Sequence, residues 1–331
     1  MQNSLLNETT IPEQKLVDGK KFPVVYAPVD KGAVDESTFM NWLVENKAML
    51  RSNLEQNGAV LFRNCPVENP DVFEKMLEVS EFVNMPYVGG AAPRKKITEN
   101  RVITANESPA SEKIPFHHEM AQVPNPPSYI FFYCDIPAEK GGSTGILHSN
   151  EIYRKFTEIS PEKAGEIEEK GVRYIRVMPD QDDLTSPIGR SWRSTFLTES
   201  KKEAEEKMKE MGMEWEWLEN NTLKTITATL PAIRQDKATG MKTFYNSIVA
   251  AYMGWQDSRN NRKEAVIKSD GSQMDEELMV TTEKAMDDLA VKFPWQKGDV
   301  LWVNNNLVLH SRYPFEGERK ILASIALADQ N

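Results

Sequence analysis

Histidine and cysteine are scarce in this sequence, and it contains no long apolar run. The 331 residues include four histidines and two cysteines, Cys65 and Cys134. Two cysteines cannot build a disulfide framework or a cysteine-rich zinc site, so we expect two buried thiols in a reducing, cytoplasmic setting. No stretch approaches the roughly 18 apolar residues of a membrane helix. The N-terminal segment also lacks the pattern of a signal peptide.

Positive charge is in deficit as well. Forty lysines and arginines face 50 aspartates and glutamates, which leaves a formal net charge of −10. A general nucleic-acid binder needs clustered lysine and arginine to neutralise phosphates, so we expect neither a nucleic-acid nor a membrane partner. The composition is that of an ordinary globular protein acting on a small molecule, and it carries no signal for an oligomeric state.

The chain shows no repeat and no low-complexity linker, so we expect one domain over residues 1–331. Apolar residues at helical spacing predict helices over residues 36–57, 71–78, 149–169, 199–211 and 275–293. Short apolar runs predict strands over residues 59–63, 101–105, 129–133, 172–177, 299–304 and 321–326. This order of elements indicates an α+β protein built on an antiparallel sandwich or jelly roll.

The segment Pro-Phe-His-His-Glu-Met contains a candidate metal site, because His117 and Glu119 are two residues apart. On a strand such residues point to the same face, which would turn His118 away. A third ligand would have to be His148 or His310, the histidines that remain. Two histidines and one carboxylate on one face leave three octahedral positions open, as in non-haem Fe(II) oxygenases.

Two further motifs suit an anionic co-substrate. A Gly-Gly-Ser-Thr segment ends at Thr144, where close backbone approach and a hydroxyl could bind an oxyanion. Arg312, Arg319 and Lys320 follow His310, and a cation placed there could hold a dicarboxylate. Taken alone, the first motif is better explained as a plain turn, and the second can be an ordinary charged strand edge.

Together these motifs resemble the taurine dioxygenase/clavaminate synthase family of Fe(II)- and 2-oxoglutarate-dependent oxygenases. His117-x-Glu119, Gly-Gly-x-Thr144, His310-x-Arg312 and a terminal Arg-Lys-Ile-Leu occur in the family's order, and YVGGAAPR, PFHHEMAQVP and VLHSRYPFEGERKILAS are similar to a clavaminate-synthase-like subgroup. The resemblance covers most of the chain. It implies a double-stranded β-helix (jelly-roll) core with flanking helices. It also implies a large insertion between the metal ligands, over about residues 150–290, that forms a lid and outer helices.

The resemblance also implies roles for individual residues. The Fe(II) ligands are then His117, Glu119 and His310. Thr144 would hydrogen-bond 2-oxoglutarate, which binds with O2 as co-substrate, and Arg319 or Lys320 would pair with its far carboxylate. Neighbouring strand residues point to opposite faces, so one of the two cations is expected in the site, and Arg319 is favoured slightly.

Candidate substrate contacts come from several segments. Tyr87 and Arg94 flank the turn-rich segment, and Asn106 lies between that segment and the metal motif. Gln122 follows the metal motif, and Arg312 follows His310. Arg193 follows a Pro/Gly loop that could cover the site.

The expected reaction is oxidation of an unactivated C–H bond in a small amino-acid-derived or carboxylic acid substrate, with release of succinate and CO2. Hydroxylation is the simplest outcome, and oxidative cyclisation or desaturation, as in kainoid formation, is the alternative by the same chemistry. A zinc hydrolase or a non-catalytic cupin-like binding protein is the alternative of another class. The hydrolase leaves the Gly-Gly-x-Thr segment and the terminal cations unexplained, and an intact ligand set argues against the binding protein.

Overall fold

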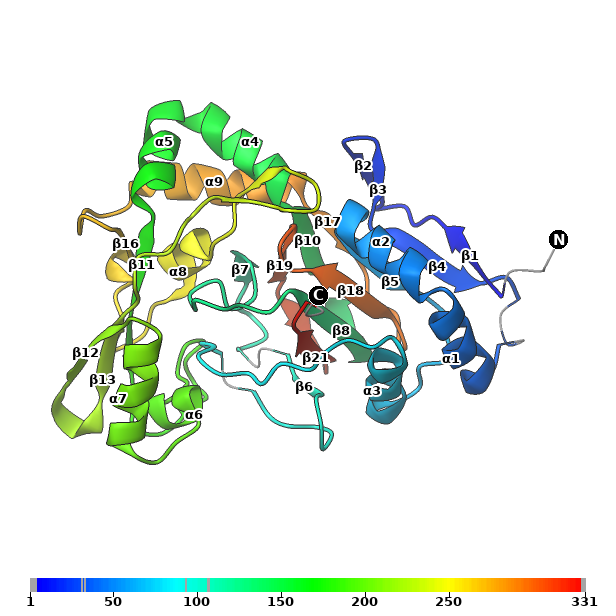
Figure 1. The fold of residues 1–331 in the computed structure, drawn as a ribbon, viewed down its shortest axis with the longest axis horizontal. Helices are drawn as coiled ribbons and strands as arrows, with labels where there is room; N and C mark the ends of the chain where they lie inside the picture. The colour runs from blue at the N-terminus through cyan, green and yellow to red at the C-terminus, as the bar shows by residue number, and fades with distance from the viewer. Residues whose placement is uncertain (1–4, 31, 33, 93, 106–107, 329–331) are drawn as a thin grey trace.

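A large sheet and three N-terminal helices form one end of the molecule. Figure 1 shows the computed structural model, which describes residues 5–30, 32, 34–92, 94–105 and 108–328. The seven-stranded sheet has the order β1-β4-β5-β18-β8-β21-β6. Its strands are β1 (Leu6–Thr9), β4 (Val24–Pro28), β5 (Ala59–Phe62), β18 (Val300–Asn304), β8 (Tyr129–Ile136), β21 (Lys320–Ala326) and β6 (Ile103–Thr104). The helices are α1 (Glu36–Glu45), α2 (Lys47–Asn57) and α3 (Pro70–Val79).

Strand alternation gives the large sheet two apolar faces. Phe62, Phe131 and Trp302 point to one face, where they pack with side chains of α1, α2 and α3. Their neighbours Leu61 and Phe132 point to the other face and pack against the second sheet. The large sheet is therefore the middle layer between the N-terminal helices and the smaller sheet.

The second sheet carries the candidate metal ligands. It has four strands in the order β17-β10-β19-β7. They are β17 (Val291–Phe293), β10 (Thr144–His148), β19 (Val308–Arg312) and β7 (Ile114–His117), and all their pairings are antiparallel. Ile146, Phe293 and Val308 of this sheet share a buried core with the large sheet.

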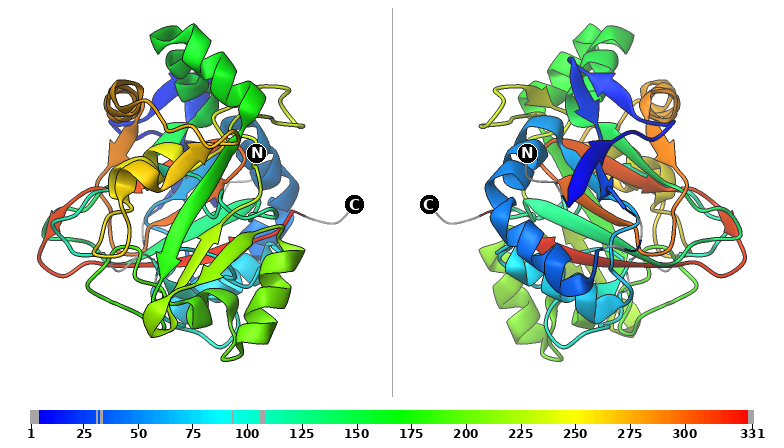
Figure 2. Two further views of the ribbon diagram at one scale, coloured as in Figure 1. Left: turned by 90° about the vertical axis from the view of Figure 1, so that its left-hand side faces the viewer. Right: turned by 90° about the vertical axis from the view of Figure 1, so that its right-hand side faces the viewer.

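The chain between β10 and β17 forms the opposite end of the molecule. Its helices are α4 (Ser149–Ile159), α5 (Pro161–Lys170), α6 (Trp192–Phe196), α7 (Lys201–Glu210), α8 (Ile248–Gly254) and α9 (Glu276–Leu289). Its third sheet has the order β12-β13-β11-β16, with β12 (Glu214–Trp217), β13 (Leu223–Ile226), β11 (Val172–Met178) and β16 (Val266–Lys268). This insertion faces the viewer in the left-hand view of Figure 2, and the N-terminal helices do so in the right-hand view.

Short hairpins and turns complete the fold. The two-stranded pairs are β2 (Lys15–Val17) with β3 (Lys20–Phe22), β14 (Arg234–Gln235) with β15 (Lys242–Thr243), and β9 (Lys140–Gly141) with β20 (Phe315–Glu316). Short 3-10 turns are η1 (Glu219–Asn221) and η2 (Arg262–Glu264). Across the described ranges, no helix combines the length and apolar character that a membrane crossing would require.

The expected mixture of helices and mainly antiparallel strands is confirmed, but two long helices are each broken once. Residues 36–57 form α1 and α2, separated at Asn46, whose side-chain amide donates to the carbonyl of Trp42 at 2.8 Å. The second helix ends at Gly58, which adopts the left-handed conformation. Residues 149–169 divide at Pro161, which starts α5 because proline suits the first helical turn.

Two other segments also differ from the expected elements. The helix expected over residues 275–293 ends at Leu289, and Val291–Phe293 pairs with β10 as an alternating buried-exposed-buried strand. In residues 101–105, the strand is restricted to Ile103–Thr104, and the buried Arg101 before it donates to the carbonyl of Phe82 and the hydroxyl of Ser324. Both cysteines are free and buried, as expected, and burial raises the pKa of each thiol.

Candidate metal centre

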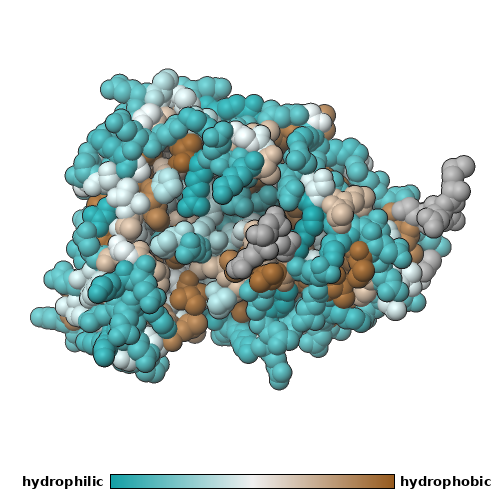
Figure 3. Space-filling model, viewed as in Figure 1, coloured by the Kyte–Doolittle hydropathy of each residue, from teal (hydrophilic) through white to brown (hydrophobic). Residues whose placement is uncertain are grey.

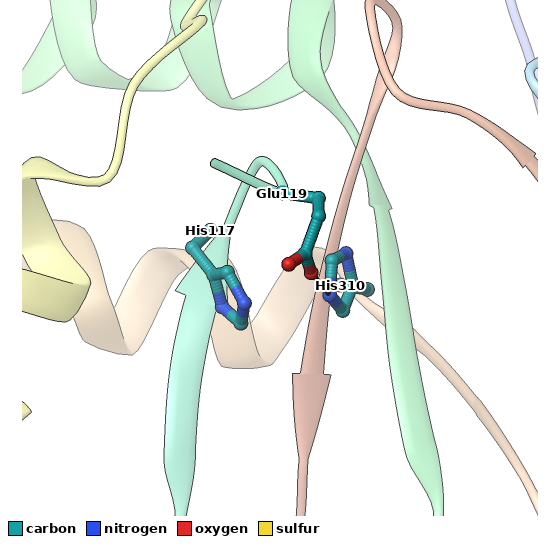
Figure 4. Close-up of side chains that lie close together, drawn as sticks. All are labelled: His117, Glu119 and His310. Atoms are coloured by element: carbon teal, nitrogen blue, oxygen red, sulfur yellow. Dashed lines mark ion pairs between the residues drawn. The ribbon is translucent and has the colours of Figure 1, made fainter. Parts of the chain in front are cut away.

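Neighbouring strands bring the two histidines of the candidate site together. His117 is the last residue of β7, and it lies opposite His310 of β19 in the antiparallel register. The expectation that Glu119 lies on the same strand is wrong. It follows β7 in a turn in which the amide of His118 donates to the carbonyl of Asn246 and Met120 has a φ of 54°. Figure 4 shows that this turn carries the Glu119 carboxylate toward both imidazole rings.

The three side chains converge closely enough to hold one ion. One ligand atom from each of His117, Glu119 and His310 lies within 4.8 Å of the other two (Figure 4). Glu119 Oε2 is 3.4 Å from His310 Nε2. The Nδ1 atom of His117 lies 2.9 Å from the carbonyl of Pro115, which leaves Nε2 as the ring atom available to an ion.

The protonation states fit a metal ion. Burial and the nearby His310 lower the pKa of His117 to about 4, so its ring is neutral at neutral pH. Burial alone would raise the pKa of the Glu119 carboxyl, but Arg94 and the two histidines lower it to about 2. Glu119 Oε2 is buried and accepts no hydrogen bond from any residue that the structure describes. A divalent cation would satisfy this atom, so the residues fit the metal that their donor set suggests.

Asn305 supports the turn that carries Glu119, a contact that the sequence reasoning missed. Its side-chain oxygen accepts from the amide of Glu119 at 2.8 Å, and its Nδ2 donates to the carbonyl of Glu119 at 3.0 Å and to that of Pro127 at 2.8 Å. The signal available was the run of three asparagines shortly before His310.

The other two histidines lie outside the group of three converging side chains. The ring of His118 lies 2.6 Å from the carbonyl of Asn305 and 2.9 Å from the hydroxyl of Ser149, and it stacks on Tyr245. It is therefore packed and hydrogen-bonded rather than turned to the metal centre, as expected. His148 stands at the N-cap position of α4 without a side-chain capping hydrogen bond.

Arg319 and Lys320 point in different directions. Arg319 Nη2 is 3.4 Å from the hydroxyl of Thr144, and its Nε donates to the carbonyl of Gly142 at 2.9 Å. The hydroxyl of Thr144 also accepts from the indole of Trp295 at 3.0 Å. Lys320 instead pairs with Asp135 at 2.8 Å, with 42% of its side chain exposed, and lies outside the cavity described next.

A cavity of about 560 Å³ contains the three converging side chains, Thr144 and Arg319. Its opposite wall comes from the insertion, through residues of the 185–188 loop and of α8 and the segment after it. The insertion contributes mainly uncharged side chains to the cavity, together with Glu283 of α9: Thr185, Pro187, Ile188, Ser247, Ala250, Met253, Gly254, Trp255, Gln256 and Glu283. Figure 3 shows the surface hollowed between the insertion and the central sheets, with residues of mixed hydropathy around the hollow.

The expected substrate contacts differ in position. Tyr87, Arg94 and Gln122 line the cavity, and Arg94 donates to Glu119 Oε1 at 2.8 Å. Arg193 does not line the cavity, which corrects that expectation, because its guanidinium is held by Asp180 and Glu199.

Of the two remaining candidates, Arg312 lies in the described part of the chain. Arg312 lines the cavity, but its guanidinium donates to three backbone carbonyls, those of Ser108, Pro109 and Glu112, at 2.6–2.7 Å. Such contacts position the loop that follows Asn106. Asn106 itself falls outside the described residues.

Comparisons with known proteins identify the family of the chain. The model of the family described as taurine catabolism dioxygenase TauD, TfdA family, matches residues 22–325. A clavaminate synthase-like protein of Arabidopsis thaliana is 44% identical over 329 residues, which cover 98% of this chain and 99% of that protein. The dapdiamide synthesis protein DdaC of Enterobacter agglomerans is 29% identical over 289 residues, or 83% of each chain.

The fold is similar to that of an asparagine oxygenase solved with Fe(II), 3-hydroxyasparagine and succinate. The TM-score is 0.53 at 13% identity, over 88% of this chain and 83% of that one. The family match, the relative of 44% identity and the similar fold lead to one conclusion. The chain belongs to the TauD/TfdA family and is an Fe(II)- and 2-oxoglutarate-dependent dioxygenase.

Proposed function

We propose that this enzyme oxidises an unactivated C–H bond of a small amino-acid-derived or carboxylic acid substrate, most simply by hydroxylation. The observation that carries the proposal is the convergence of His117, Glu119 and His310 in one cavity with Thr144 and Arg319. Ferrous iron would supply the redox chemistry there, since with 2-oxoglutarate and O2 it oxidises C–H bonds and releases succinate and CO2.

His117, Glu119 and His310 are the proposed iron ligands. The pairing of β7 with β19 holds the two rings side by side, with their centroids 4.3 Å apart. Glu119 would bind through Oε2, because Oε1 already accepts from Arg94. We also infer that the two central sheets form a double-stranded β-helix within a single domain. The insertion between β10 and β17 would then cover the site.

Arg319 and Thr144 are the proposed contacts of 2-oxoglutarate. Burial lowers the pKa of Arg319 to about 10, so the side chain remains cationic at neutral pH. Its planar guanidinium can bind a carboxylate through two hydrogen bonds, which a lysine cannot do. Thr144 lies close enough to Arg319 for its hydroxyl to donate to the same anion.

Replacing Arg319 with methionine is expected to raise the KM for 2-oxoglutarate about 10- to 100-fold, because a charge-assisted contact contributes about 1.5–3 kcal/mol. Lys320→Met is the matched control, and we expect a KM near that of the wild type, since a partly exposed pair contributes under about 1 kcal/mol. Steady-state succinate assays measure both variants. A larger rise in KM for Lys320→Met than for Arg319→Met would exchange the two roles.

The cavity and the relatives both support a small primary substrate. A volume of about 560 Å³ has to hold 2-oxoglutarate as well as the reacting part of the substrate, which favours a small molecule. One solved structure with a similar fold points to amino acid chemistry, since it is an asparagine oxygenase with 3-hydroxyasparagine. Oxidative cyclisation or desaturation would use the same site with a substrate held differently.

The proposed function is tested with purified protein and a panel of amino acids and small carboxylic acids. Under anaerobic conditions, Fe(II) and 2-oxoglutarate are expected to give a visible charge-transfer band. In air, the correct substrate is expected to raise succinate release above the rate without substrate, and mass spectrometry then separates a gain of oxygen from a loss of two hydrogens. Metal binding without the band, and without succinate from any member of the panel, would contradict the proposal.

A further inference from the structure

Arg94 contacts the proposed metal ligand Glu119 directly. We propose that Arg94 is a positioning residue that occupies one oxygen of Glu119, so that the metal takes the other oxygen and a coordination position stays open for 2-oxoglutarate. This inference rests on the proposed role of Glu119 as a metal ligand. It gives Arg94 a role other than the substrate contact expected from the sequence.

The two oxygens of Glu119 have different surroundings. Oε1 accepts from Arg94 Nη2 at 2.8 Å, and the two side chains are only 3% and 6% exposed. Oε2 accepts no hydrogen bond within the described parts of the chain and faces His310 Nε2 at 3.4 Å. A charge-assisted hydrogen bond in a nearly dry environment holds the carboxylate in one rotation, with Oε2 toward the imidazoles.

Arg94 is itself held by an aromatic ring. Its guanidinium carbon lies 4.5 Å from the centre of the Tyr87 ring, and that of Arg190 lies 4.7 Å from the same centre. Arg190 also donates to the carbonyls of Tyr87 and Gly90 at 3.2 and 3.0 Å. A Cβ atom at Gly90 would come within 2.1 Å of the Tyr87 ring, so the ring position depends on a glycine there.

Coordination geometry explains why one occupied oxygen matters. A carboxylate can bind a metal through one oxygen or through both. With two histidines and one oxygen, three of six positions remain, and a 2-oxo acid uses two of them. A carboxylate that turned to bind through both oxygens would take one of these three positions. The hydrogen bond from Arg94 opposes that rotation.

The positive charge of Arg94 also favours the binding of 2-oxoglutarate. Arg94 offsets the negative charge of Glu119, and both side chains are nearly buried. A bound divalent cation therefore keeps its full charge toward the 2-oxoglutarate dianion. Removing Arg94 should weaken the binding of the dianion without weakening that of the cation, because a positive charge that repels the cation is removed at the same time.

The proposal is tested with two probes that do not turn over, Co(II) and then N-oxalylglycine, an unreactive analogue of 2-oxoglutarate. For Arg94→Met, we expect a Kd for Co(II) no higher than that of the wild type and a Kd for N-oxalylglycine at least about tenfold higher. The absorption spectrum of bound Co(II) should also change, because it reports coordination number. Arg94→Lys, which keeps the charge and one donor, should restore part of the N-oxalylglycine affinity.

Arg193→Met is the matched control, because Arg193 also pairs with carboxylates but lies outside the cavity. Both Kd values should equal those of the wild type. The proposal is overturned if folded Arg94→Met binds both probes as the wild type does, or loses both affinities in proportion. If Arg94→Met does not fold, Tyr87→Leu replaces it, because this variant keeps the arginine but removes the ring beneath it. Its Kd for N-oxalylglycine should rise more than its Kd for Co(II), by a smaller factor than in Arg94→Met. Equal changes in both affinities of Tyr87→Leu would then reject the idea.

Glu119→Gln distinguishes this proposal from the one on which it rests. If that variant binds Co(II) as tightly as the wild type, Glu119 is not a ligand and the proposed metal centre fails. If it loses Co(II) while Arg94→Met behaves as the wild type, only the role of Arg94 is rejected.

Discussion

Replacing Glu119 with alanine is expected to abolish substrate-dependent succinate release and to weaken Fe(II) binding by more than about 100-fold. Loss of a residue that merely supports a metal ligand lowers affinity about 10- to 100-fold, and loss of the proposed carboxylate ligand itself should exceed that range. Neither histidine can replace the negative charge of this group. Titration of Fe(II) or Mn(II) under anaerobic conditions measures the affinity, and coupled assays measure succinate.

The alanine variant also leaves Arg94 buried without its carboxylate, which by itself would destabilise the fold. Glu119→Gln separates the two effects, because the amide oxygen can still accept from Arg94 but is a poor ligand for Fe(II). Glu316→Ala serves as the control, since Glu316 pairs with Lys140 on the surface. A folded Glu119→Gln variant that retained both the charge-transfer band and turnover would remove Glu119 from its proposed role.

The sequence predicted which side chains meet at the centre but not how they reach it. Four histidines left few combinations, and the His-x-Glu spacing selected one pair. The reasoning assumed an alternating strand, whereas the strand ends at His117 and a turn stabilised by Asn305 delivers Glu119. Asn305 is far from Glu119 in sequence, so its contact depends on tertiary structure that local patterns do not encode.

The choice between Arg319 and Lys320 needed the strand register. A shift of one residue moves every side chain to the other face of a sheet. The pairing of β21 with β8 is irregular between Lys320 and Ile321, so simple alternation could not be counted back from the buried residues. The structure places Arg319 in the cavity with Thr144 and Lys320 beside Asp135.

Breaks in long helices were also beyond the sequence reasoning. Leu43 and Leu50 lie on one apolar stripe, so the pattern continued through Asn46 although its side chain competes for a helix carbonyl. After Leu289 the helical pattern runs into Val291 and Phe293, whose apolar side chains suit either a helix or a strand. Pairing with β10 decides in favour of the strand.

Arg63→Met is expected to destabilise the protein by about 3–5 kcal/mol, because it leaves the fully buried Asp299 without its partner. Arg63 binds both carboxylate oxygens, at 2.7 and 3.2 Å, and also donates to the carbonyl of Pro294. Burial raises the pKa of Asp299, and Arg63 opposes that effect. Urea unfolding followed by circular dichroism measures the loss.

The double variant Arg63→Met/Asp299→Asn should recover most of this stability, since it removes the buried charge and keeps an acceptor for the amide of Gln296. Lys284→Met is the control, because its exposed pair with Asp288 should contribute under about 1 kcal/mol. A loss in Arg63→Met no larger than this control, or no recovery in the double variant, would contradict the argument.

The pH dependence of Arg63→Met has a definite sign. Without Arg63, the pKa of Asp299 in the folded state should rise further above its unfolded value. The unfolded chain then releases this proton at a lower pH than the folded chain, so stability falls as pH rises between the two pKa values. The destabilisation should therefore be smaller near roughly pH 5 than near roughly pH 8. Asp299 directly precedes β18, which leads to the strand of His310, so metal affinity shows whether the change reaches the metal centre. If the pair acts on stability alone, the folded variant should bind metal about as tightly as the wild type.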